Sequence, residues 1–122
     1  MASSLSLLER KRLLDSIGTQ YGYASAHTGD PGATGTANEV AGGSPAYARK
    51  AITWAAADSS TPSVKALAAT FPVFDIPAGT TVAFIGLWTL DTGGTYGGCW
   101  DVTDEVFAGQ GTYTLSAGTI SL

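Results

Sequence analysis

The sequence predicts a mainly β protein, an antiparallel β-sandwich or a small barrel, with one N-terminal amphipathic helix and a long Gly/Thr-rich loop. Three observations lead to this prediction. Glycine, threonine and serine recur along nearly the whole chain after Ile17, which is typical of short strands and tight turns. Residues 80–90 are apolar on both alternating faces, as expected of a central buried strand. Residues 6–9 have the spacing of a helix capping box.

The helix is expected to begin after Ser6 and to stop at Gly18. The Ser6 hydroxyl can accept a hydrogen bond from the first turn, while Glu9 reaches back to the Ser6 amide. Gly18 can adopt the left-handed conformation that ends a helix. Apolar side chains recur at helical spacing at Leu7, Leu14 and Ile17, with Leu13 beside them, and Arg10, Lys11 and Arg12 are expected on the other side. This stripe buries either against the protein's own sheet or on a neighbouring subunit.

Seven stretches are predicted strands: residues 21–27, 47–54, 64–73, 80–90, 95–100, 112–115 and 119–122. The first two alternate weakly and are expected to be half exposed. In the third, Pro72 suggests an edge position or a bulge, beside an apolar row made by Leu67, Ala69, Phe71 and Val73. The fourth should be central, with Val82, Phe84, Ile85, Leu87 and Trp88 in the core, and a turn at residues 91–94 should return it as a hairpin.

Residues 27–46 form the longest stretch without apolar periodicity. A loop of this length in a compact domain is usually functional or mobile. Its Asp30, Asn38 and Glu39 carry the oxygen ligands that calcium prefers, but their spacing matches no calcium loop, so neither a metal nor a cofactor is predicted. We expect the loop and the helix to contact partners, through Leu7, Leu8, Arg10, Lys11, Arg12, Leu14, Asp30, Asn38 and Glu39.

Length and composition exclude several classes of protein. The 122 residues suffice for one domain, organised as a helical arm at residues 1–18 and a single β domain at residues 19–122. Hydrophobic residues make up 44% of the chain and charged ones 13%, which excludes a disordered polyelectrolyte. The net charge of -4 argues against nucleic-acid binding. Neither a signal peptide nor a membrane span is predicted, so we expect a soluble protein made in the host cytoplasm.

No catalytic motif is evident, and we expect that the protein is not an enzyme. His27 is the only histidine and could in principle activate Cys99 or a serine. The residues around Cys99 match no nucleophile motif, however, and a lone histidine is more often structural. We expect the single cysteine to be buried by packing.

The order of short motifs along the chain is distinctive. The motifs are residues 27–32 (HTGDPG), 38–40 (NEV) with 42–43 (GG), 47–49 (YAR), 71–73 (FPV), 77–80 (PAGT), 85–88 (IGLW) and 111–113 (GTY). Over about residues 20–122 the chain resembles a family of small tailed-bacteriophage virion proteins, labelled head decoration, minor tail or tail fibre proteins. The resemblance implies a structural virion role without chemistry.

Within that role, we expect a capsid decoration protein that binds and stabilises the assembled major capsid protein at the capsid surface. The chain is small and acidic, has no long fibrous repeat, and carries an amphipathic leader and a long loop. A homotrimer is favoured, with a dimer as the alternative. Two other functions stay open: a tail-associated minor tail or fibre protein, and a carbohydrate-binding module for host surfaces. A sugar site would use exposed aromatic side chains, for which the candidates are Tyr21, Tyr23, Tyr47 and Tyr96.

Overall fold

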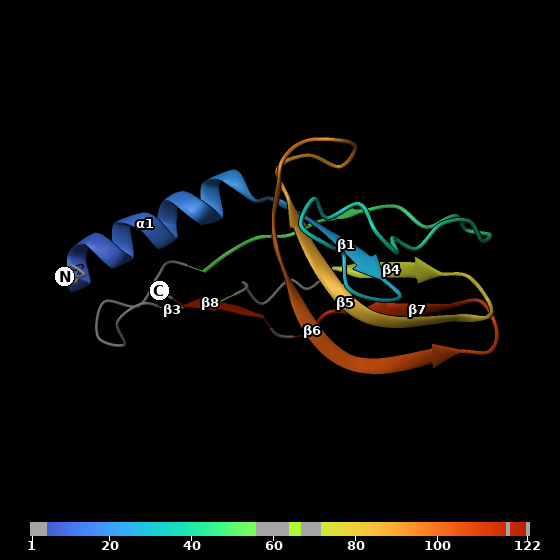
Figure 1. Ribbon diagram of the computed structural model, residues 1–122. Coiled ribbons are helices and arrows are strands. Elements are labelled where there is room, and N and C mark those ends of the chain that lie inside the picture. The colour runs from blue at the N-terminus through green and yellow to red at the C-terminus, as the bar shows by residue number, and fades with distance from the viewer. Residues whose placement is uncertain (1–4, 56–63, 67–71, 117, 122) are drawn as a thin grey trace.

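A computed structural model describes residues 5–55, 64–66, 72–116 and 118–121 of the chain. It confirms a mainly β protein with antiparallel sheets and one N-terminal helix (Figure 1). The elements are, in order, α1 (Leu7–Gln20), β1 (Tyr23–His27), β2 (Lys50–Ala51), β3 (Val64–Ala66), β4 (Val73–Ile76), β5 (Thr80–Trp88), β6 (Tyr96–Phe107), β7 (Gly111–Thr114) and β8 (Thr119–Ser121).

Helix α1 begins as predicted and ends later. The Ser6 hydroxyl accepts a hydrogen bond from the Glu9 amide at 3.2 Å, which confirms the N-cap. The Glu9 carboxylate instead accepts hydrogen bonds from Arg12. The predicted stop at Gly18 is wrong, because the helix continues to Gln20 and the Tyr21 amide still donates to the Ile17 carbonyl at 2.9 Å.

The main sheet has the strand order β2-β1-β5-β6, and all of its pairs are antiparallel. The predicted central strand is confirmed as β5, and Val82, Ile85, Leu87 and Trp88 are buried. Phe84 is only half-buried, so its place in the core was wrongly predicted. The predicted hairpin is also confirmed, but β6 runs seven residues beyond the predicted Trp100 and pairs along the whole of β5.

One face of the main sheet packs on β4 and β7, which pair with each other. The core between them contains Ala24 and Ala26 from β1, Phe74 and Ile76 from β4, Val82, Ile85 and Leu87 from β5, Phe107 from β6 and Tyr113 from β7. The predicted strand at residues 64–73 is divided: residues 64–66 form β3, and residues 67–71, with most of the predicted apolar row, lie outside the described residues. Val73 was predicted in that row but is 45% exposed, because Phe74 takes the inward position.

Val40 and Tyr47 of the long loop, residues 28–49, pack on the core side of the main sheet. The opposite face is covered by the earlier part of the loop, since Gly35 lies against the rings of Tyr96 and Trp88 and the Ala37 carbonyl accepts a hydrogen bond from His27. Ser25 and His27 of β1 and Trp88 of β5 are therefore buried under it, and the expected half-exposure of the first strand is wrong. Only Lys50–Ala51 of the second predicted strand is a strand. The loop continues along the edge of β1 beyond β2, since the Val40 amide donates to the Ala26 carbonyl at 3.0 Å and His27 and Glu39 form an isolated β-bridge.

The molecule has two different ends (Figure 1). Helix α1 extends from one end with β3 and β8 beside it, and β3 and β8 pair with each other. The turns that join β4 to β5 and β6 to β7 lie at the other end. Within the described residues, no helix is long and apolar enough to cross a membrane.

Candidate interaction surfaces

Glu39 of the long loop is held inside the protein by two neighbours. Arg49 donates to both carboxylate oxygens, from Nε at 3.1 Å and from Nη2 at 3.2 Å. The Tyr47 hydroxyl donates to Glu39 at 2.9 Å and accepts from the Ala26 amide at 2.9 Å. The side chains of Arg49 and Glu39 are only 10% and 22% exposed, so this pair stabilises the loop on the sheet.

Arg49 also joins the loop to the β5–β6 hairpin. Its guanidinium carbon lies 3.7 Å from the centre of the Trp88 ring, and Nη1 donates to the carbonyls of Leu90 at 3.3 Å and Gly93 at 2.9 Å. Tyr96 packs against Trp88, with the two ring centres 5.4 Å apart. No pattern in the sequence indicates this role of Arg49, because its partners are distant in the chain.

Ser25 and His27 form the serine–histidine contact that sequence reasoning considered. His27 Nδ1 donates to the Ala37 carbonyl at 2.8 Å, so Nε2 is the acceptor for the Ser25 hydroxyl at 2.7 Å. Trp88 Nε1 donates to the same hydroxyl at 2.9 Å. Burial lowers the pKa of His27, in keeping with a neutral ring. Ser25 and His27 are 0% exposed, which closes them to any substrate in this conformation.

Asp30 and Asn38 shape the long loop. Asp30 Oδ1 accepts from the Gly32 amide at 2.8 Å, as in a turn, and Asn38 Nδ2 donates to the Asp30 carbonyl at 3.0 Å. Asn38 has a φ of 61°, a left-handed conformation that asparagine tolerates. In the described part of the chain, no three His, Cys, Asp or Glu side chains are grouped as metal ligands. The predicted partner contacts of these residues and of Glu39 stay predictions.

The predicted contact residues of α1 divide into a buried and an exposed set. Leu14 is 0% exposed and Arg10 is half-buried, and Lys11 pairs with Asp15 at 2.8 Å. Leu7 is 49% exposed and Leu8 is 78% exposed, and the Arg12 side chain is 72% exposed. Basic and apolar residues therefore share the exposed side instead of separating. We call Leu5, Leu8 and Arg12 the arm surface.

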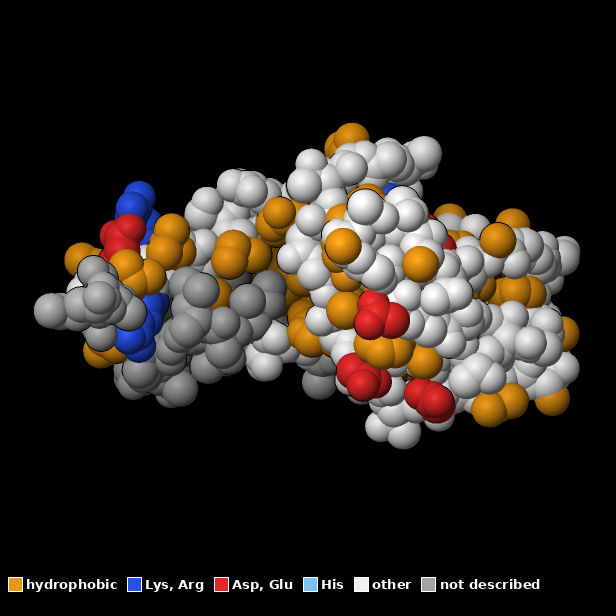
Figure 2. Space-filling model, in the orientation of Figure 1, with side chains coloured by type: hydrophobic (Ala, Val, Ile, Leu, Met, Phe, Trp, Pro, Cys, Tyr) orange, Lys and Arg blue, Asp and Glu red, His pale blue; other side chains and the backbone are white. Residues whose placement is uncertain are grey.

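An acidic surface that the sequence analysis missed lies on β6. Asp101, Asp104 and Glu105 are exposed, and Val106 beside them is 75% exposed. Figure 2 shows the acidic side chains gathered over this strand with hydrophobic side chains between them. The sequence indicates this surface by three acidic residues within residues 101–105, in a chain that has no lysine or arginine after Lys65. We call these four residues the β6 surface.

An open hollow of about 450 Å³ lies where α1 meets the sheet. It is lined by Ile17, Tyr21, Leu87, Gly97, Gly98, Cys99, Trp100 and Thr119. Cys99 is exposed, so its predicted burial is wrong; it lies on an outer position of β6. Of the tyrosines proposed for sugar binding, only Tyr21 lines this hollow. Tyr47 instead donates a hydrogen bond to Glu39, and Tyr96 packs on Trp88. Sugar binding stays a prediction.

Comparison with known proteins gives one family. The model of the family described as podophage GP4 fiber I protein gp80 matches residues 19–122, all of the chain except most of α1 and the residues before it. No curated protein and no solved structure gives a significant match. The predicted resemblance to phage virion proteins is confirmed, and the matched description is that of a fibre.

Proposed function

The chain belongs to the podophage GP4 fiber I protein gp80 family and is a structural phage protein, and from this premise we propose that it forms part of the tail fibre of the virion. The observation that carries the proposal is the family match over residues 19–122. The capsid decoration role expected from the sequence finds no support in this description, which favours the tail-associated alternative.

The two ends of the molecule support a fibre role. The end with α1 carries the exposed leucines and Arg12, whereas the far end consists of the β4–β5 and β6–β7 turns (Figure 1). An apolar and basic arm suits attachment to another protein. We therefore propose that the α1 end contacts a neighbouring chain of the fibre and that the turns of the far end face outward.

We further propose that the protein acts without catalysis. The Ser25–His27 contact, the nearest approach to a catalytic pair, lies beneath Trp88 and the long loop with no exposed atom. Its hydrogen bonds are all made within the protein, as expected of a structural network. Hydrolysis by purified virions that is lost in Ser25→Ala, with folding preserved, would refute this part of the proposal.

Imaging of intact particles tests the location. An epitope inserted between Ala108 and Gly109, an exposed turn at the far end, leaves α1 free. Gold-labelled antibody against this epitope should mark the tail and spare the capsid lattice, and untagged particles provide the control. Label distributed over the capsid faces would overturn the tail-fibre proposal and restore the decoration role.

A further inference from the structure

Two surfaces of the described chain combine strong apolar exposure with charge of opposite sign. Leu8 at 78% and Val106 at 75% are the most exposed large hydrophobic side chains in the described residues, and the next is Leu90 at 52%. Leu8 lies one helical turn from Arg12, and Val106 follows Asp104 and Glu105 directly. Leaving such side chains in water is unfavourable, so both are candidates for burial in an interface.

The charges of these surfaces are complementary. Residues 1–20 carry three basic and two acidic groups, a net charge of +1. Residues 66–122 carry five acidic groups and no basic one, a net charge of -5. Among the residues that the structure describes, Asp101, Asp104 and Glu105 take part in none of the four ion pairs. The β6 surface therefore attracts a cation from outside its own fold.

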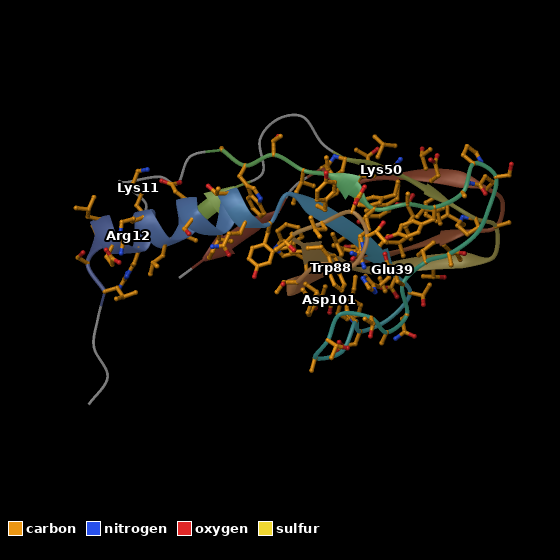
Figure 3. The ribbon with its side chains drawn as sticks, turned by 90° about the horizontal axis from the view of Figure 1, so that it is seen from above. Lys11, Arg12, Glu39, Lys50, Trp88 and Asp101 are labelled. Atoms are coloured by element: carbon orange, nitrogen blue, oxygen red, sulfur yellow. The ribbon has the colours of Figure 1, made fainter. Side chains whose placement is uncertain are left out.

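Within one copy, the two surfaces do not meet. Figure 3 shows Lys11 and Arg12 on the helix, well away from Asp101 on the body. Arg12 is held on the helix by its contacts with Glu9, three residues earlier. We propose that the arm surface of one copy binds the β6 surface of a second copy, with Leu8 packed against Val106 and Arg12 facing Asp104 and Glu105.

The form of β6 favours docking of a helix over addition of a strand. β6 pairs only with β5 among the described strands, so its other edge is open to a neighbour. Opposite Ala83 it has an irregularity, since Val82 pairs with Glu105 and Phe84 with Asp101. Charges and bulges of this kind prevent a further strand from pairing. At usual spacings, the 14 residues of α1 span about 21 Å and residues 101–107 about 23 Å, so the helix can lie along this segment.

This self-association goes beyond the tail-fibre proposal and is tested without the virion. The full purified chain is examined by sedimentation and light scattering over a range of concentrations. We expect an assembly larger than the monomer. Leu8→Gln keeps a good helix former and should weaken association at least about tenfold, as expected for a residue at an interface centre. Arg12→Glu alone, and Asp104→Arg with Glu105→Arg, should each weaken it.

Combining the charge reversals on both surfaces provides the decisive measurement. The triple variant R12E/D104R/E105R should regain association, because the charges are complementary again with their positions exchanged. Leu90→Gln and Asp91→Lys are the matched controls, since both residues are exposed but belong to neither surface, and they should associate like the unchanged chain. Circular dichroism melting checks that every variant is folded.

Three outcomes would overturn the proposal. The first is a folded chain that stays monomeric at about 100 μM, a concentration at which even a weak specific contact is populated. The second is association that Leu8→Gln and Arg12→Glu leave unchanged, which would mean that another surface mediates it. The third is a triple variant that stays monomeric, which would show that the two surfaces do not face each other. None of these outcomes alters the location measured on virions.

Discussion

The guanidinium of Arg49 lies over the Trp88 ring, with its central carbon 3.7 Å from the ring centre, and the same group binds the Glu39 carboxylate. Arg49 thus connects the long loop, the central strand β5 and the β5–β6 turn through one side chain. A planar guanidinium can stack on the ring and bind a carboxylate with two nitrogens at once, which lysine cannot do.

We predict that Arg49→Ala lowers the free energy of unfolding by about 3 kcal/mol, because it leaves Glu39 as a largely buried charge without its partner. Urea denaturation followed by tryptophan fluorescence measures the change. The neighbouring Lys50→Ala is the control: its ion pair with Asp75 is 3.9 Å long and more exposed, so the loss should stay below about 1 kcal/mol. Equal losses in the two variants would show that Arg49 contributes no more to stability than the exposed ion pair of Lys50.

Gly86 is predicted to be irreplaceable in the centre of β5. A Cβ atom there would lie 2.5 Å from Ser25 Oγ and 3.1 Å from His27 Nε2, inside a hydrogen-bonded network that is fully buried. Gly86→Ala should therefore cost about 3 kcal/mol of stability, the upper range for overpacked cores. Gly22→Ala is the matched control, because nothing lies within 4 Å of its Cβ position. A thermal melt of Gly86→Ala that matches that of Gly22→Ala would refute this prediction.

Stability should depend on pH through His27, the only histidine of the chain. Burial lowers its pKa from the ordinary 6.5, so the unfolded chain binds the proton more readily than the folded one. Stability is then full above about pH 6.5 and falls as the pH drops from there toward the lower pKa of the folded protein. Denaturation midpoints between about pH 5.5 and 7.5 measure this slope.

The variant His27→Gln is the control for the pH dependence. It removes the titrating group, so its lower stability should be nearly constant over the same range. Carboxylates titrate mainly below this range and do not imitate the effect. A slope that persists in His27→Gln would assign the titration to another group.

The sequence predicted the elements whose pattern is local. Ser6 and Glu9 mark the start of α1 with a spacing of three residues, and β5 was identified as central because both of its faces are apolar. The site around Arg49 escaped prediction because Glu39, Arg49 and Trp88 come together only when the loop folds over the sheet. The periodicity of one segment cannot predict a contact such as that between Arg49 and Trp88, which are 39 positions apart.

Exposure was harder to predict than strand position. Cys99 was expected inside because cysteine is often buried, yet it lies on the outer strand β6 of the sheet. β1 was expected to be half exposed because its sequence alternates only weakly, but Ser25 and His27 are buried and hydrogen-bonded, with the Ser25 hydroxyl also accepting from Trp88. Whether a polar side chain is buried depends on partners from other segments, which the sequence pattern does not name.

We predict that residues 1–20 are dispensable for folding of the β domain. The hydrophobic core formed by the described residues contains no side chain of α1, and Tyr21, which packs against that core, lies just after the helix. Leu14 is the fully buried residue of α1, and the helix packs beside β3.

A chain of residues 21–122 should therefore unfold cooperatively, with a thermal midpoint within about 5 °C of the full chain, equivalent to roughly 1 kcal/mol. Tryptophan fluorescence reports mainly on the body, since Trp54, Trp88 and Trp100 all lie outside α1 and only Trp100 lines the hollow beside Ile17. In the full chain, Leu14→Ala should reduce the helical dichroism at lower temperature while leaving the fluorescence transition in place, because it loosens α1 from its neighbour without opening the core. A truncated chain without a cooperative transition would instead make α1 an integral part of the fold, and the arm would then stabilise its own domain before it could bind anything else.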